Sequence, residues 1–400
     1  MSEPSAAPVS GSTGVPGLRT MRSASFRTTV ALLLLLIGGS LVGLLLIRQA
    51  TAEGGQFAID FGAYYLAAER SAAGEAIYAA VMLQGPVDAQ GVDQYLYPPL
   101  FAQLLRPLTV LSLEGAALVW FLTQSLAVFA ALWVGTGIGG ARRSVERALW
   151  CAVAAVFFLP VFDTLWKGNV SGVLALSSIM VALGGTAAGF GAGFGALLKA
   201  VPGTLVPAAL VMDSRSRLTV VVTLGAALGL SFLLAPAAWL DYPAVVRNML
   251  AGSSDYATNL APAAVVGRSV SDVAGTAVRV GTLGLAVVSV LGSVWMARSH
   301  HGGPAAALLG VIALLLVPAS LWYHYLAILL PFAAMAWPRA NGLQRGLLFG
   351  AAVLVTVGLA WLPAAFAGGT VMGAVSLFVL WPRSRQGKWS ALPRPDHGTI

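Results

Sequence analysis

Charged side chains are scarce in this 400-residue chain: Asp, Glu, Lys and Arg together make up 10% of it, whereas hydrophobic residues make up 58%. Soluble globular proteins average about 25% charged residues. A chain with so few charges cannot cover itself with a water-compatible surface. Charge-free stretches long enough to cross about 30 Å of hydrocarbon, which takes roughly 20 helical residues, recur from end to end. We therefore expect an all-α polytopic membrane protein.

Cysteine is nearly absent. The single residue, Cys151, lies inside an apolar run, so neither an intramolecular disulfide nor a CxxC metal or redox site can form. The adjacent pair His300 and His301 has no acidic neighbours in the sequence. Isolated Gly-x-Gly spacings, such as Gly191 with Gly193, lie in apolar runs, where glycines typically let helices pack closely. We expect no metal ion and no cofactor.

Basic residues give the chain a net charge of +8, but they form short clusters between apolar runs rather than one basic face. Cytoplasmic loops of membrane proteins show this pattern, so we expect membrane lipids and no nucleic acid as partners. Residues 1–27 are rich in Ser, Gly and Pro and predict a disordered cytoplasmic tail. Residues 383–400 predict a basic cytoplasmic tail, and residues 28–382 form the expected membrane domain.

About twelve apolar segments are expected within that domain. They run roughly over 28–47, 97–112, 114–137, 147–162, 169–186, 189–212, 217–240, 272–297, 304–320, 323–337, 343–363 and 367–381. An even number places both termini on the cytoplasmic side, with an extracytoplasmic loop at about 49–96 and a second outer loop at about 241–271. One basic cluster disagrees: Arg142, Arg143 and Arg147 would lie outside if residues 97–112 cross the membrane, unless that short segment is re-entrant.

The first loop gathers acidic residues, and its stretch from residue 57 to residue 70 has apolar positions at helical spacing. We expect a short amphipathic helix at the membrane interface, with Asp60 and Tyr64 four residues apart on one face. A carboxylate at the rim of a helix bundle can accept a proton from a bound hydroxyl. The alternative is an ordinary solvated aspartate at the start of a surface helix.

Tyr97 stands just before Pro98 and Pro99, at the start of an apolar segment. The prolines fix how the chain enters that segment, and aromatic residues suit a membrane interface. Tyr97 is therefore either an interfacial anchor or a direct substrate contact.

Several short motifs occur in a characteristic order between residues 55 and 340. They are Asp60-Phe61 with Tyr64-Tyr65, Tyr78, Tyr97-Pro98-Pro99-Leu100-Phe101, Gly168-Asn169-Val170, Leu198-Lys199 with Pro202, and Trp322-Tyr323-His324-Tyr325. In order and spacing the sequence resembles glycosyltransferase family 87, which belongs to the GT-C class and includes α-1,2-mannosyltransferases that use polyprenyl-phosphate mannose. Gly168-Asn169-Val170-Ser171 departs from the Gly-Gln-Val-Asn common in that family, and residues 259–261 depart from Asn-Gln-Ser. These departures bear on the sugar and the acceptor.

The resemblance implies a GT-C-type bundle of about 12 helices in the plasma (inner) membrane, with the active site facing the extracytoplasmic side. It implies an inverting enzyme that moves a hexose, with mannose the expected sugar, from a polyprenyl-phosphate donor to a lipid or glycan acceptor. Because enzymes of the GT-C class keep an essential acidic residue in the first outer loop, it also implies that Asp60 is the catalytic base.

Cationic and aromatic residues would hold the donor. Lys199 lies in an apolar run, where an ionisable group needs a partner; the donor phosphate would supply one, and snorkelling to the interface is the alternative. His324 with Tyr323 resembles both a sugar platform and an interfacial aromatic belt. Arg268, in the second outer loop, is a weaker phosphate candidate.

Two other functions fit the same features. A secondary transporter would also have about twelve segments, broken helices and a central lysine, although the acidic first loop and the absence of visible repeats speak against it. A flippase or non-catalytic scaffold for lipid-linked sugars could keep the same motifs.

Overall fold

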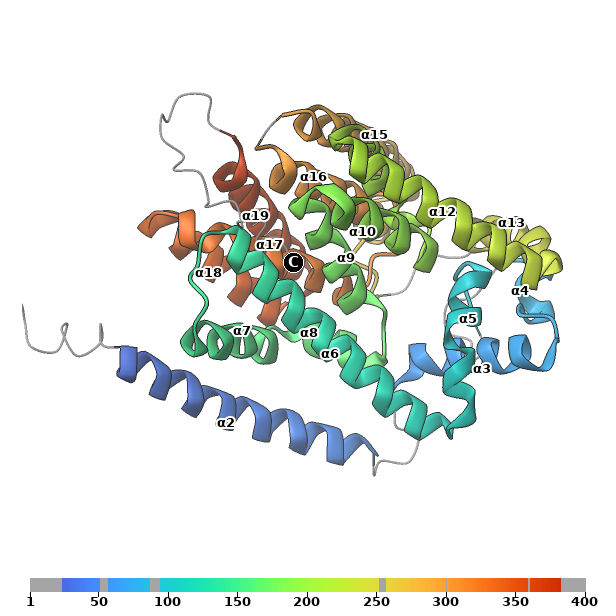
Figure 1. Ribbon diagram of the computed structural model, residues 1–400, viewed down its shortest axis with the longest axis horizontal. Coiled ribbons are helices and arrows are strands. Elements are labelled where there is room, and N and C mark those ends of the chain that lie inside the picture. Colours follow the sequence, from blue (N-terminus) through green and yellow to red (C-terminus); the bar gives the residue numbers. More distant parts are fainter. Residues whose placement is uncertain are drawn as a thin grey trace, which may run out of the picture.

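The computed structural model describes residues 24–50, 57–86, 94–251, 257–299, 301–358 and 360–382, and within them the chain is helical without any β-strand (Figure 1). The elements of the first half are α2 (Ala24–Ala50), α3 (Ile59–Ala73), α4 (Ala80–Gln84), α5 (Pro99–Leu105), η1 (Arg106–Val110), α6 (Leu113–Ile138), α7 (Val145–Phe157), α8 (Leu159–Lys167), α9 (Ser171–Leu183) and α10 (Gly185–Leu198). Those of the second half are η2 (Val201–Leu205), α11 (Val206–Met212), α12 (Ser214–Leu234), α13 (Pro236–Ala251), α14 (Pro262–Ser269), α15 (Asp272–Ala297), α16 (Gly303–Leu316), η3 (Tyr323–Leu329), α17 (Leu330–Ala336), η4 (Trp337–Arg339), α18 (Gly342–Val357) and α19 (Leu362–Leu380).

Five helices of the described residues are long and apolar enough to cross a membrane, namely α2, α6, α12, α15 and α19. The pair α7 and α8 adds a sixth if it forms one broken span, since it bends by 71°. Large apolar side chains on these helices are exposed, for example Leu36 at 67% and Leu233 at 80%. Water would disfavour such surfaces and lipid would not. The prediction of an all-α polytopic membrane protein is confirmed.

Helix α2 lies along the edge of the bundle and packs mainly against α7 (Figure 1). Arg27 near the start of α2 donates to Glu146 in the first turn of α7, with Nε 2.6 Å from Oε1. Gly38 lets the two helices approach, because a Cβ there would lie 2.6 Å from Val156. Residues 24–27, predicted to belong to a disordered tail, are helical, and residues 1–23 and 383–400 lie outside the described part.

Glycines allow close packing in the centre of the bundle. A Cβ at Gly189 of α10 would lie 2.3 Å from the carbonyl oxygen of Ser216 on α12, and a Cβ at Gly191 would lie 2.5 Å from that of Ser177 on α9. Side chains there would force the helices apart, which supports the packing role expected for the glycines of this run.

Some expected segments have a different form. The segment expected at 97–112 contains only α5 and η1, and the seven residues of α5 rise about 10 Å, too little to cross a bilayer. The segment expected at 189–212 breaks at Lys199, because α10 ends at Leu198 and η2 starts at Val201. Pro202, near the start of η2, lacks the N–H needed to continue a helix. The expected outer loop at 241–271 holds α13 and α14.

Candidate active site

The candidate site is built where the end of α8 docks against the start of α3. Gly168 ends α8 with φ of 68°, a left-handed conformation that glycine adopts without steric cost. A Cβ at this position would lie 2.7 Å from the Cβ of Phe61. The amide of Ala58 donates to the carbonyl of Trp166 at 2.8 Å, and the indole of Trp120 donates to that of Gly168 at 2.7 Å. Carbonyls that the end of α8 leaves unpaired thus bind the start of α3 through Ala58 and bind α6 through Trp120.

Ala58 is the one non-glycine residue with positive φ in the described chain, at 58°. Such a conformation costs about 1–2 kcal/mol for an L-residue and persists only when its surroundings enforce it. Here the hydrogen bond to Trp166 enforces it, two residues before Asp60.

Asp60 is partly exposed in the first turn of α3. Its Oδ2 accepts a hydrogen bond from Nδ2 of Asn169 at 2.7 Å. The Oδ1 of Asn169 in turn accepts from the amide and the hydroxyl of Ser171, at 3.1 and 2.7 Å. Because the backbone amide of Ser171 can only donate, it must face the oxygen of Asn169, and the NH₂ group of Asn169 then faces Asp60. The other oxygen of Asp60, Oδ1, has no hydrogen bond within the described residues and is free to accept a proton.

An aromatic wall surrounds the buried side of α3. Phe61 stacks on Trp120 with ring centroids 5.7 Å apart, and Tyr64 packs edge-on against Phe101 at 5.0 Å. The predicted helix exists, and its expected place at the membrane interface stays a prediction. Phe61, Tyr64 and Tyr65 lie on it at 0 to 6% exposure, so α3 is packed against α5 and α6 as part of the core.

Tyr64, Tyr97 and Lys199 meet in one hydrogen-bonded group. The hydroxyl of Tyr64 donates to that of Tyr97 at 2.7 Å, and Nζ of Lys199 lies 3.3 Å from the same oxygen. Lys199 also donates to the hydroxyl of Tyr325. Its Nζ lies over both tyrosine rings, 4.8 Å from the centroid of Tyr97 and 4.4 Å from that of Tyr325. Three of the predicted site residues therefore lie together.

No carboxylate forms an ion pair with Lys199 in the described part of the chain. Its ammonium is held by hydroxyls and ring faces, which stabilise a cation without neutralising it. Burial and the nearby charge of Asp60 raise the pKa of Tyr97 well above its usual value, so Tyr97 stays neutral and bridges the acidic and the cationic halves of the site.

His324 is buried at 2% exposure in η3, directly before Tyr325. Its Nδ1 lies 3.4 Å from Oδ2 of Asp163 on α8. The hydroxyl of Thr164, the residue after Asp163 on α8, donates to the backbone carbonyl of His324 at 3.3 Å. The structure therefore brings His324 to the edge of the group formed by Lys199 and the tyrosines.

Arg268 and Tyr323 have other partners. Arg268 donates to the carbonyl of Asn259 at 2.9 Å, and the side chain of Asn259 bonds the backbone at Ala319 and Leu321. Arg268 thus supports the loop before η3. The hydroxyl of Tyr323 donates to the carbonyl of Val355 on α18 at 2.7 Å. The substrate-binding roles expected for these two residues remain predictions.

Three residues of the site had not been singled out from the sequence as site residues: Asn169, Tyr325 and Asp163. Asn169 and Tyr325 stood within the ordered motifs, and those motifs were the signal that could have pointed to them. Asp163 lies beside an apolar run, where an acidic residue is rare and functional by default.

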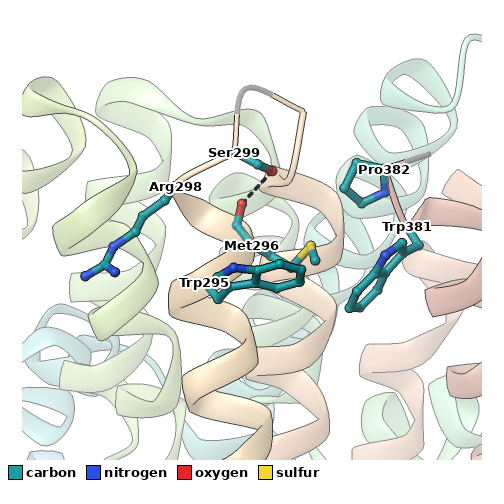
Figure 2. A pocket seen from close by; sticks show the side chains of 6 residues that line it. All are labelled: Trp295, Met296, Arg298, Ser299, Trp381 and Pro382. Atoms are coloured by element: carbon teal, nitrogen blue, oxygen red, sulfur yellow. Dashed lines mark hydrogen bonds between the residues drawn. The ribbon is translucent and has the colours of Figure 1, made fainter. Parts of the chain in front are cut away.

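A cavity of about 340 Å³ lies elsewhere, lined by Trp295, Met296, Arg298, Ser299, Trp381 and Pro382 (Figure 2). It lies at the end of α15 remote from Arg279, whose guanidinium bonds the carbonyls of residues 316–318 just before η3. Figure 2 shows the side chain of Arg298 directed away from the space between the two tryptophans. This cavity is separate from Asp60.

Comparison with protein families identifies the family of the chain. The family model described as Glycosyltransferase family 87 matches residues 95–318, more than half of the chain. The chain belongs to glycosyltransferase family 87. It is therefore a glycosyltransferase built as a helical membrane protein. No curated protein and no solved structure matches it.

We predict that Gly168→Ala destabilises the protein and disrupts the site. An alanine there costs about 1–2 kcal/mol for the left-handed backbone and about 1–3 kcal/mol for the contact with Phe61. The matched control is Gly74→Ala at the other end of α3, where φ is 74° and no atom lies within 4 Å of the added Cβ. Thermal unfolding of the detergent-solubilised variants should give a clearly lower midpoint for Gly168→Ala. Equal midpoints would show that the docking of α8 on α3 tolerates a side chain.

Proposed function

We propose that this family 87 glycosyltransferase inverts the anomeric centre of a hexose, which we expect to be mannose, as it moves the sugar from a polyprenyl-phosphate donor to a glycolipid or glycan acceptor. The observation that supports this function is one cluster that holds both Asp60, whose carboxylate has an open oxygen, and Lys199, which has no acidic partner within the described residues. These are the two groups that the reaction needs, since the acceptor must lose a proton and the leaving phosphate must be stabilised.

Asp60 is the general base of this proposal. Its Oδ2 is held by Asn169, which fixes the carboxylate while Oδ1 stays open. As the acceptor oxygen forms its bond to the anomeric carbon, the hydroxyl proton passes to Oδ1. The bond between that carbon and the phosphate oxygen breaks at the same time, and its electron pair leaves with the polyprenyl phosphate. Attack opposite the leaving group converts a β-linked donor into an α-glycoside.

Lys199 is the proposed phosphate contact. Aromatic rings and the hydroxyls of Tyr97 and Tyr325 already position its ammonium. No reorganisation of the cation is then needed as charge develops on the phosphate, and this preorganisation is a large source of catalysis. Tyr64 supports the group through its hydrogen bond to Tyr97.

We propose that the chain still crosses the membrane about twelve times, but that some of the crossing segments differ from those expected from the sequence. We propose that residues 97–112 do not cross and that α10 and η2–α11 cross separately as a hairpin. The amide of Gly185 at the start of α10 lies 2.9 Å from Oδ2 of Asp213 just after α11 and donates to it, which supports a reversal at Lys199. The passes are then α2, α6, α7–α8, α9, α10, η2–α11, α12, α15, α16, η3–α17, α18 and α19.

This assignment also accommodates the basic cluster at residues 142–147. Glu146 pairs with Arg27 at the start of α2, and Arg339 donates to the carbonyl of Ile138 at the end of α6. The start of α2, the end of α6 and the start of α18 therefore lie at one end of the bundle. We propose that this end is cytoplasmic and that Asp60 faces the extracytoplasmic side of the plasma membrane.

We predict that Asp60→Asn slows sugar transfer at least a hundredfold, because a positioned base contributes about 10² to 10⁴-fold and the amide cannot accept the proton. The measurement is transfer from a radiolabelled polyprenyl-phosphate sugar by purified protein. Glu69→Gln, an exposed carboxylate on the same helix, is the control and should keep most activity. Parental rates in Asp60→Asn would exclude it as the base. A parent that transfers no sugar from any such donor would favour a transporter or flippase.

Lys199→Gln should reduce donor use by about tenfold to a hundredfold, the loss expected for one hydrogen bond to a charged group. Titration of the donor in the same assay measures it. Arg217→Gln is the control, because it also removes one positive charge, from an exposed side chain that bonds the carbonyl of Leu210. If Lys199→Gln and Arg217→Gln reduce donor use by the same factor, the change in net charge rather than the local contact accounts for the effect.

The proposed orientation of the bundle in the membrane predicts which engineered cysteines an external thiol reagent can reach. After Cys151→Ser, single cysteines are placed at Glu75, exposed after α3, and at Arg143, exposed between α6 and α7. An impermeant thiol reagent should label position 75 in intact cells and position 143 only after lysis, because charged reagents do not cross the bilayer. The reverse pattern would invert the topology.

A further inference from the structure

A second group of charged side chains lies beside the cluster of Asp60 and Lys199. Asp163 of α8 stands between two nitrogen-bearing side chains: Oδ1 lies 3.3 Å from Nζ of Lys167, and Oδ2 lies 3.4 Å from Nδ1 of His324. The side chain of His324 is 3% exposed and that of Asp163 is 14% exposed. Both ring nitrogens of His324 and Oδ2 of Asp163 are buried, and none of the three makes a hydrogen bond within the described residues. A buried polar atom without a partner is costly, so a ligand that supplies the partner would be favoured.

Few other titratable groups surround His324. Tyr323 and Tyr325 flank it on η3, and Asp163 and Lys167 face it from α8. Helices α9, α16, α17 and α19 also pack against η3, and their sequences contain no Asp, Glu, His, Lys, Arg, Cys or Tyr. Asp163 is therefore the one acidic side chain that these elements bring to His324.

The pair is connected to both halves of the candidate site. Tyr325, the residue after His324, contacts Lys199, and the rings of His324 and Tyr325 lie 4.8 Å apart. On α8, Asp163 is followed by Thr164, which bonds the backbone of His324. Five residues further on, Asn169 holds Asp60. Helix α8 carries the contact to the histidine, and the turn that directly follows it carries the contact to the base.

We propose that Asp163 is a positioning residue that acts through His324. When the donor binds, the carboxylate of Asp163, which lies 3.4 Å from Nδ1, accepts a hydrogen bond from Nδ1–H and stabilises the imidazolium, as the carboxylate of a catalytic triad does for its histidine. The Nε2–H of that imidazolium then donates a hydrogen bond to the departing phosphate, as a second cation beside Lys199. No proton changes place in this contact, because the polyprenyl phosphate leaves as an anion. The inference rests on the proposed function.

A double-mutant cycle tests whether Asp163 acts through His324. His324→Gln and Asp163→Asn should each lower kcat by about tenfold to a hundredfold, the loss expected for one hydrogen bond to a charged group. The donor KM should change little, because the contact strengthens as charge develops on the phosphate. In the His324→Gln background, Asp163→Asn should cost almost nothing further. Additive losses in an active parent would overturn the proposal.

Asp213→Asn is the matched control. Asp213 also uses its two oxygens for part-buried structural contacts, from the amides of Ser216 and Gly185, at the opposite end of α10 from Lys199. Asp213→Asn should lower the unfolding temperature. Its effect on kcat should be the same in the parent and in the His324→Gln background. Coupling of the same size between Asp213 and His324 would show that the cycle reports stability and would overturn the assignment.

A spectroscopic measurement tests the pairing without any sugar transfer. In protein labelled with ¹⁵N-histidine, the resonances that disappear in His324→Gln identify His324 among the four histidines. Nδ1 should carry a proton in the parent and should exchange it more readily in Asp163→Asn. An unprotonated Nδ1 in the parent would overturn the pairing. A parent that has the pairing but transfers no sugar would overturn the proposed function and the phosphate role together.

Discussion

The candidate site depends on one docking contact, in which the left-handed turn at Gly168 brings the end of α8 onto the start of α3. Ala58, just before α3, and Trp120 of α6 bond carbonyls at that turn, so α3 cannot shift without losing the hydrogen bond from Ala58. Because Asn169 follows Gly168 directly, the same turn sets the amide that holds Asp60. A single backbone conformation therefore links the position of the base to the packing of two helices.

The arrangement of charge follows from the same constraint. A carboxylate and an ammonium in direct contact would neutralise each other, and neither would be available to a substrate. Here the neutral hydroxyl of Tyr97 binds Lys199, and the amide of Asn169 binds Asp60. Each charge is thus held by neutral groups, at the cost of partial burial. Such an arrangement suits a reaction in which one group receives a proton and the other faces a growing negative charge.

Much of the local structure could be predicted from residue patterns. Apolar runs indicated the membrane helices, and helical spacing indicated α3 close to its observed bounds of Ile59 and Ala73. The same patterns were less reliable at residues 97–112 and 189–212. Length and hydropathy measure whether a run can cross a bilayer, but they do not register a break such as the one at Lys199. The burial of α3 was missed because its aromatic positions are covered by α5 and α6, which follow it in the sequence only after α4 and the segment before Pro99.

The sequence by itself determined that this protein is a helical membrane protein and which ionisable residues are rare enough in it to matter. Composition and periodicity carry that information because the cost of burying a charge in hydrocarbon acts on each residue separately. Only the tertiary structure decided which of these residues meet. Asn169 and Asp60 are 109 residues apart in the sequence, and Lys199 and Tyr97 are 102 residues apart. Contacts of this kind depend on how helices pack across the whole bundle, so no local pattern specifies them. For the same reason Asp163, although it lies beside an apolar run, acquired its partner His324 only in the folded chain.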